Sequence, residues 1–212
     1  MISRFQKILF LIWPPYEAHV AIKYIEENEK QVDQNVLWDQ TINEFTNVLY
    51  DGLPLHEISN EALSIQEKEK FRKDTIEQKA SWLSGNNGLS VAIISLVPVF
   101  FDPKWSIANS VKILALFFYI LSLINFIVGA YYSILVRRVS AYFGPSVEGI
   151  VEKCKNGKWD EKINIAIILT ENKWNEKTLT KKINYLTVAE SLFLRGISFL
   201  ALSTIILLCN VM

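Results

Sequence analysis

The chain is poor in the residues that build metal, disulfide and many catalytic sites. Its 212 residues include only two cysteines, Cys154 and Cys209, and two histidines. Two cysteines are too few for a disulfide scaffold, and no CxxC or HxxxH spacing indicates a metal site. The composition therefore predicts no metal and no other cofactor.

The chain also lacks a surplus of charge and a phosphate-binding loop. Its 22 Lys and Arg are balanced by 22 Asp and Glu, which argues against a general nucleic-acid binder. Gly85-Asn86-Asn87-Gly88 has neither the lysine nor the flanking strand of a phosphate-binding loop. No nucleophile elbow surrounds any serine, and the acidic residues are scattered along charged helix faces. We therefore expect that the protein is not an enzyme.

What the chain does have is long apolar blocks. Hydrophobic residues make up 50% of it, which excludes intrinsic disorder. The clearest block is Ile113–Val136, which is bounded by Lys112 and by Arg137-Arg138. At about 1.5 Å per residue this helix reaches roughly 36 Å, enough to cross the ~30 Å hydrocarbon layer. A buried helix of a soluble protein is the alternative, but a helix apolar on every side needs a larger protein around it.

Two further blocks have the length of membrane spans. Residues 80–101 carry no charge but are polar in their first half, which is acceptable when those residues face other helices. Residues 191–212 carry Arg195 near their start and no charge from Gly196 onward. The sequence therefore predicts three transmembrane helices, at 80–101, 112–136 and 191–212.

The distribution of Lys and Arg predicts the orientation of the chain. These residues are numerous before the first span and in 137–190, but the loop 102–111 contains only Lys104. Basic residues favour the cytoplasmic side. We expect residues 1–79 and 137–190 to be cytoplasmic, and the loop and the C-terminus to be external, in a multi-pass protein of a bacterial inner membrane.

The two cytoplasmic parts are predicted to be helical, which makes the fold class all-α. Helices are expected over Tyr16–Lys30 and Gln34–Tyr50. The charged stretch Asn60–Lys79 has no breaker before the membrane and predicts one long helix of about 40 residues that includes the first span. The β-branched run Ile163–Leu169 fits a strand, but we favour a helix over Asp160–Lys173 that Asp160 caps. Residues 175–190 are expected to form a helix that continues into the last span.

Polar and small residues inside the predicted spans are the candidate functional positions. The polar candidates are Asn86, Asn87, Asn125, Glu190 and Arg195, and the packing candidates are Gly85, Gly88, Gly129 and Gly196. Polar groups in lipid need partners, so these side chains either line a water path or fix an oligomer, or they are ordinary interhelical hydrogen-bonding groups. Three spans cannot easily enclose a pore, so conduction would require a homo-oligomer.

Two stretches resemble a known class of membrane protein. The charged helix leading into Asp74–Gly88 resembles the start of the first span in small bacterial membrane effectors of anti-phage defence, the CBASS- and Pycsar-like transmembrane effectors. The tract Lys181–Gly196 is similar to the way such proteins return to the membrane. The resemblance implies a cytoplasmic part that responds to a nucleotide messenger or a protein partner. It also implies a membrane part that oligomerises and permeabilises the inner membrane.

Other functions are compatible with the same sequence. A membrane-anchored adaptor or sensor that recruits a soluble partner needs the same cytoplasmic domain and long helix but does not conduct. A small-solute transporter subunit is disfavoured because the chain has no inverted repeat and no paired broken helices. A membrane enzyme has the least support, since no catalytic constellation is present.

Overall fold

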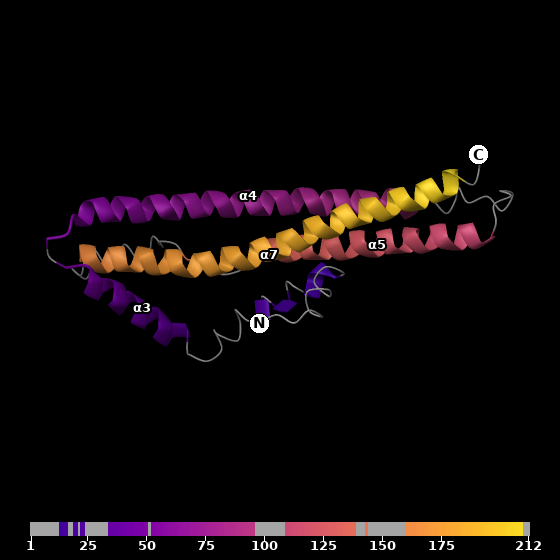
Figure 1. Ribbon diagram of the computed structural model, residues 1–212. Helices are drawn as coiled ribbons and strands as arrows, with labels where there is room; N and C mark the ends of the chain where they lie inside the picture. Colours follow the sequence, from indigo (N-terminus) through magenta and orange to yellow (C-terminus); the bar gives the residue numbers. More distant parts are fainter. Residues whose placement is uncertain are drawn as a thin grey trace. The chain divides into compact units, whose positions relative to one another are not determined.

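The computed structural model is helical throughout most of the part of the chain that it describes (Figure 1). The described residues are 13–16, 19–20, 22–23, 34–50, 52–95, 109–138, 143 and 160–209. The main helices are α3 (Gln34–Val48), α4 (Leu55–Ser95), α5 (Asn109–Arg137) and α7 (Glu161–Leu208). The predicted all-α class is therefore confirmed for these residues. Of the helix predicted over Tyr16–Lys30, the residues beyond Lys23 lie outside the described residues.

Helix α4 joins the charged stretch and the apolar stretch in one element. It has 41 residues, as the absence of a breaker predicted. It begins at Leu55 because Pro54 fits the first turn, where its carbonyl accepts hydrogen bonds from the amides of Glu57 and Ile58. The turn before it depends on Gly52, whose φ of +111° would strain any other residue.

Helix α7 is longer than the sequence predicted. Its 48 residues unite the two predicted helices and the last span without a break. The Oδ1 atom of Asp160 accepts a hydrogen bond from the Lys162 amide at 2.9 Å, so the predicted N-cap is confirmed. The strand alternative for Ile163–Leu169 is wrong, because Ile165 and Ala166 are neighbours on one buried helix face that packs on Leu49.

Two of the helices are long and apolar enough to cross a membrane. They are α5, over Ser110–Arg137, and α7. The third predicted span, 80–101, is helical up to Ser95, and its last residues lie outside the described part of the chain. The predicted external loop lies outside it as well, up to residue 108.

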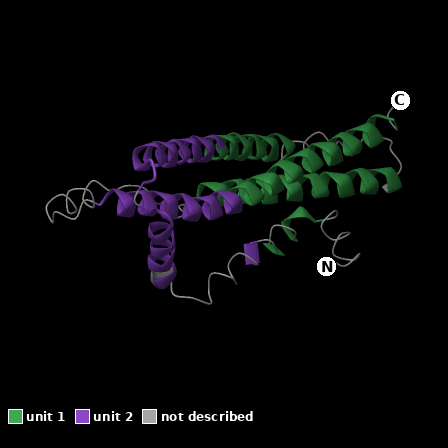
Figure 2. Cartoon of the chain, turned by 60° about the vertical axis from the view of Figure 1, so that its left-hand side comes forward, with its two compact units in different colours: residues 1–20, 76–138, 182–212 green, residues 21–75, 139–181 purple. Residues whose placement is uncertain are grey.

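The chain divides into two compact units (Figure 2). Unit 1 comprises residues 1–20, 76–138 and 182–212, and unit 2 comprises residues 21–75 and 139–181. One boundary between the units falls inside α4, after Thr75, and another falls inside α7, after Lys181. Each of these two helices therefore contributes to both units.

Each unit has its own apolar core. In unit 2, Leu49, Ile165 and Ala166 form the buried centre, with side chains from α3 and the start of α4 packed on it. In unit 1, Ile94 of α4 and Tyr119 and Phe126 of α5 form the centre. Phe193 and Leu200 of α7 pack against this second core, so unit 1 is a three-helix bundle.

Candidate functional site

The interior of unit 1 contains a polar seam in addition to its apolar core. Its members are buried side chains contributed by all three helices of the bundle. They are Asn87 of α4, Ser122, Asn125 and Ser133 of α5, and Lys182 and Ser203 of α7. A buried polar group is more informative than an exposed apolar one, so the seam is a candidate functional site.

Hydroxyl groups of the seam hydrogen-bond from one helix to another. The Ser122 hydroxyl donates to the Gly196 carbonyl at 2.7 Å, and the Ser203 hydroxyl donates to the Ala115 carbonyl at 2.9 Å. The Tyr119 hydroxyl donates to the Ile94 carbonyl near the described end of α4. Such bonds between helices in a membrane contribute on average about 0.6 kcal/mol each. Together they hold α5 against both of its neighbours.

The two predicted asparagines of the seam bond mainly within their own helices. The Asn125 side chain donates to the Leu121 carbonyl at 2.7 Å. The Asn87 side chain, which is 0% exposed, donates to the Leu83 carbonyl at 2.9 Å. Its Oδ1 atom is buried and has no hydrogen-bond partner among the described residues. Asn86, by contrast, is only half-buried.

The predicted glycines fall into two groups. A Cβ at Gly129 would lie 3.2 Å from Oδ1 of Asn87, and a Cβ at Gly196 would lie 2.9 Å from the Phe126 ring. These two glycines therefore permit the close approach of helices within the bundle. At Gly85 and Gly88 a Cβ would meet nothing within 4 Å, so neither contacts a neighbouring helix in the described part of the chain. A packing role for these two stays a prediction that requires a second chain.

A buried ion pair at one end of the seam was not predicted. The Lys182 ammonium lies 2.7 Å from Oε1 of Glu77 and donates to the Val136 carbonyl at 2.8 Å. Lys182 is 4% exposed. Val136 stands in the last turn of α5, where carbonyls lack helical partners and a positive charge is favourable. No local pattern could reveal this contact, because the three residues come from three helices far apart in the sequence.

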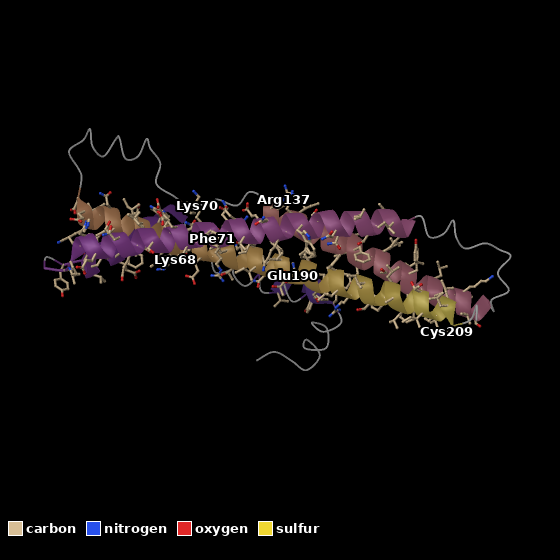
Figure 3. All side chains as sticks on the ribbon, turned by 90° about the horizontal axis from the view of Figure 1, so that it is seen from above. Lys68, Lys70, Phe71, Arg137, Glu190 and Cys209 are labelled. Atoms are coloured by element: carbon tan, nitrogen blue, oxygen red, sulfur yellow. The ribbon has the colours of Figure 1, made fainter. Side chains whose placement is uncertain are left out.

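A groove runs along the surface of unit 1 between α4 and α7. It has a volume of about 450 Å³ and is lined by Lys79, Trp82 and Leu83 of α4 and by Glu190, Phe193 and Leu194 of α7. The Trp82 and Phe193 rings meet edge to face at 6.2 Å. Glu190 is exposed on α7 (Figure 3), whereas the predicted Arg195 is half-buried outside this lining.

The contacts of unit 2 are of a different kind. The Gln66 amide donates to Oε2 of the buried Glu171 at 2.8 Å, and the Asn172 amide donates to the Ala62 carbonyl at 3.1 Å. The Asn175 side chain pairs with both the amide and the carbonyl of Phe143, at 2.9 and 2.8 Å. The first two of these bonds join α4 to α7 beside the apolar core of this unit.

A carboxyl group of unit 2 has a perturbed pKa. Burial raises the pKa of Glu69 above its ordinary value, and the nearby charge of Glu176 raises it further, while Arg72 opposes the shift. One Glu69 carboxyl oxygen is buried without a hydrogen-bond partner in the described chain. Protonation of Glu69 is therefore favoured by the fold.

The outward faces of unit 1 are apolar. Large exposed side chains on α5 include Ile113, Phe117, Ile120, Ile127, Tyr131 and Ile134. Others lie on α4 and α7, including Trp82, Leu89, Ile93, Ile197 and Ile205. So many exposed large apolar side chains on neighbouring helices are more than a soluble domain usually presents.

The fold and these surfaces define a class of protein: in its described part, the chain is helical and has two helices long and apolar enough to cross a membrane. Among the residues that the structure describes, no group of His, Cys, Asp and Glu is arranged to hold a metal ion. No protein family, no curated protein and no solved structure matches the chain.

Proposed function

We propose that the protein is a bacterial inner-membrane effector that oligomerises and permeabilises the bilayer when its cytoplasmic part receives a signal. In this proposal the apolar helices of unit 1 cross the membrane, and residues 80–101 form its third span. Residues 1–79 and 137–190, which include all of unit 2, lie in the cytoplasm and respond to a nucleotide messenger or a protein partner, in a role such as anti-phage defence.

The observation that carries the proposal is the continuity of α4 and α7. Each is one unbroken helix, and each contributes to the polar contacts of unit 2 and to the apolar bundle of unit 1. A helix is stiff over several turns, so a change in its packing at one end biases its packing at the other. A signal bound by unit 2 can therefore alter the membrane bundle through two helices and without a flexible linker.

The apolar exterior of unit 1 supports its placement in lipid. Side chains such as Ile113, Phe117 and Ile127 would each lose favourable burial at about 25 cal/mol per Å² if they faced water. In a bilayer the same faces meet hydrocarbon at no such cost. The buried seam is then the expected interior of a membrane bundle, because polar groups in lipid must find partners inside the protein.

A stripe of small residues on α4 supports oligomerisation. Ser81, Gly85, Gly88 and Ala92 are exposed and repeat at intervals of three and four residues, so they lie on one helix face. The buried residues of this segment, such as Leu83, Asn87 and Ile94, lie on the opposite face. Exposed small residues at this spacing allow two membrane helices to approach closely. We infer that α4 packs on α4 of a second copy and that any conducting path lies between copies.

One observation favours the alternative of a membrane-anchored adaptor. Phe71 on the unit 2 part of α4 is 75% exposed and stands near Lys68 and Lys70 (Figure 3). Aromatic residues are enriched at protein interfaces, so an exposed one is a candidate contact for a protein partner. An adaptor would use this surface to recruit a soluble protein and would not conduct.

The test is membrane depolarisation during induced expression, measured with a potential-sensitive dye. The wild type is compared with Gly85→Leu/Gly88→Leu, which fills the small-residue stripe, and with Ala201→Leu, which enlarges an exposed residue of α7 outside the stripe. The effector predicts depolarisation by the wild type and by Ala201→Leu, and its loss in the double variant. An unchanged potential for all three, at equal membrane expression, favours the adaptor or means that the activating signal was absent. A pull-down through the cytoplasmic part then tests for a soluble partner.

A further inference from the structure

The groove of unit 1 has a polar end and an apolar end. Each helix contributes one charged residue, Lys79 from α4 and Glu190 from α7. The apolar lining follows within one turn on both helices, with Leu83 four residues after Lys79 and Leu194 four residues after Glu190. Both charges therefore stand at the same end of the groove, and both immediately precede the predicted membrane spans.

The two charges are available to a ligand. Lys79 and Glu190 are both exposed, and neither forms an ion pair or a side-chain hydrogen bond with another described residue. They are not paired with each other, although they line one groove. The groove thus presents one cation and one anion beside its apolar lining.

This combination fits one class of lipid better than others. A lipid with a phosphate and a primary ammonium group can place the phosphate at Lys79 and the ammonium at Glu190, with charge-assisted hydrogen bonds to both. A purely anionic lipid gains the first contact but is repelled by the Glu190 carboxylate. A choline lipid offers a quaternary ammonium group, which has no proton to donate to a carboxylate.

The rest of the groove matches the other parts of such a lipid. Trp82 and Phe193 form an aromatic wall next to the charges, where the glycerol and carbonyl region of a phospholipid would lie. Leu83 and Leu194 continue the wall toward the acyl chains. The volume of about 450 Å³ is in the usual range for a bound small ligand and holds a headgroup and the start of an acyl chain.

We propose that the groove between α4 and α7 is a binding site for an aminophospholipid, phosphatidylethanolamine, in the cytoplasmic leaflet. The inference rests on the membrane placement of unit 1 in the proposed function, but it does not rest on conduction. The bound lipid contacts both α4 and α7, so its occupancy would bias how these two helices pack against each other.

Native mass spectrometry of the detergent-solubilised full-length protein tests the site. The protein is mixed with equal amounts of phosphatidylethanolamine, phosphatidylcholine and phosphatidylglycerol that carry the same acyl chains. We expect phosphatidylethanolamine to be retained over phosphatidylcholine by about tenfold or more, the worth of one charge-assisted hydrogen bond. Glu190→Gln should abolish this preference, and Lys79→Ala should lower the retention of all three lipids.

Two variants serve as matched controls. Arg137→Ala removes an exposed cation at the end of α5, outside the groove, and Glu67→Gln removes an exposed carboxylate of α4 in unit 2. Both should retain the wild-type preference. Because all four altered residues are exposed, the helix content measured by circular dichroism should not change.

Two results would overturn the site. If phosphatidylglycerol is retained best and Glu190→Gln increases its retention, the groove selects anionic lipids instead. If all three lipids are retained equally by every variant, the protein holds only a non-specific lipid shell. Carbonate extraction of membranes distinguishes failure of the lipid site from failure of the proposed function. Release of the protein from the membranes would contradict both proposals. Retention of the protein without a lipid preference would contradict only the lipid site.

Discussion

In unit 2, α4 and α7 meet through polar pairs such as Gln66 with Glu171, and their outer surfaces carry most of the charge of both helices. In unit 1 the same two helices pack through aromatic and aliphatic side chains around a hydroxyl-rich seam, and their outer surfaces are apolar. The change occurs within each helix, at Lys79 in α4 and after Glu190 and Arg195 in α7. The backbone is continuous, so the difference reflects the surroundings to which each half is adapted.

The exposed fraction of a side chain does not by itself show whether that part of a helix faces lipid or water. Leu89 and Phe71 are both exposed residues of α4, with exposed fractions of 60% and 75%. Leu89 stands among small and apolar neighbours in the sequence, whereas Phe71 stands among charged residues. We interpret the first environment as lipid and the second as water.

The largest effect is expected at the buried ion pair of unit 1. Lys182→Met leaves the partly exposed Glu77 carboxylate and the Val136 carbonyl without their cation, and we expect a loss of about 2–3 kcal/mol of unfolding free energy. Denaturation of the protein in mild detergent, followed by circular dichroism, measures the loss. The exposed Lys70→Met in unit 2 is the control and should change little. The double variant Glu77→Gln/Lys182→Met should recover part of the loss, and equal instability of both would contradict the ion pair.

The next largest changes in unfolding free energy are expected at two glycines of the same bundle. Gly196→Ala places a methyl group against the Phe126 ring and should cost about 1–3 kcal/mol, because the ring must move within a packed core. Gly85→Ala meets open space and should instead stabilise α4 by roughly 0.5–1 kcal/mol. Thermal unfolding of the monomeric protein in detergent separates the two. The same sign for both variants would show that the helices pack differently.

A smaller effect is expected from a single hydroxyl of the seam. Ser122→Ala removes the hydrogen bond to the Gly196 carbonyl and should cost about 0.6 kcal/mol. Ser198→Ala on α7, whose exposed hydroxyl bonds only within its own helix, is the matched control and should cost less. Reversal of this order in the same unfolding assay would place the outer face of α7, rather than the seam, at a helix contact.

The smallest effect concerns the pH dependence of unit 2. Since the folded state raises the pKa of Glu69, the ionised carboxylate destabilises the fold, and this penalty is fully present above the raised pKa. It disappears as the pH falls toward the ordinary value of 4.5. Glu69→Gln should therefore stabilise the protein at neutral pH and flatten this part of the pH profile. Glu67→Gln, on an exposed carboxylate, should not, and parallel profiles for Glu69→Gln and wild type would refute the perturbed pKa.

Sequence patterns predicted the elements whose causes are local. The continuity of α4 follows from the absence of a breaker after Pro54, and the start of α7 follows from the capping side chain of Asp160. The joining of the two predicted helices in α7 was missed, because nothing in Lys173–Asn175 indicates whether a helix stops or continues.

The contacts within the candidate site were harder to predict because they join distant segments. Asn87 and Gly129 were each selected as intramembrane positions, but their contact depends on how α4 packs on α5. Lys182 was counted only as a cytoplasmic charge, and its burial against Glu77 depends on the pairing of α4 with α7. The groove around Trp82 and Phe193 likewise arises only when these helices are adjacent.

Cysteine labelling in intact bacteria tests the membrane placement of unit 1 most directly. Phe71→Cys and Leu89→Cys are made separately on α4 after both native cysteines are replaced by serine, and each variant is treated with a membrane-impermeant maleimide before and after permeabilisation. Our account predicts that the cysteine at 71 reacts only after permeabilisation and that the cysteine at 89 reacts in neither state. Equal reaction at both positions after permeabilisation would place the whole of α4 in water and contradict the account.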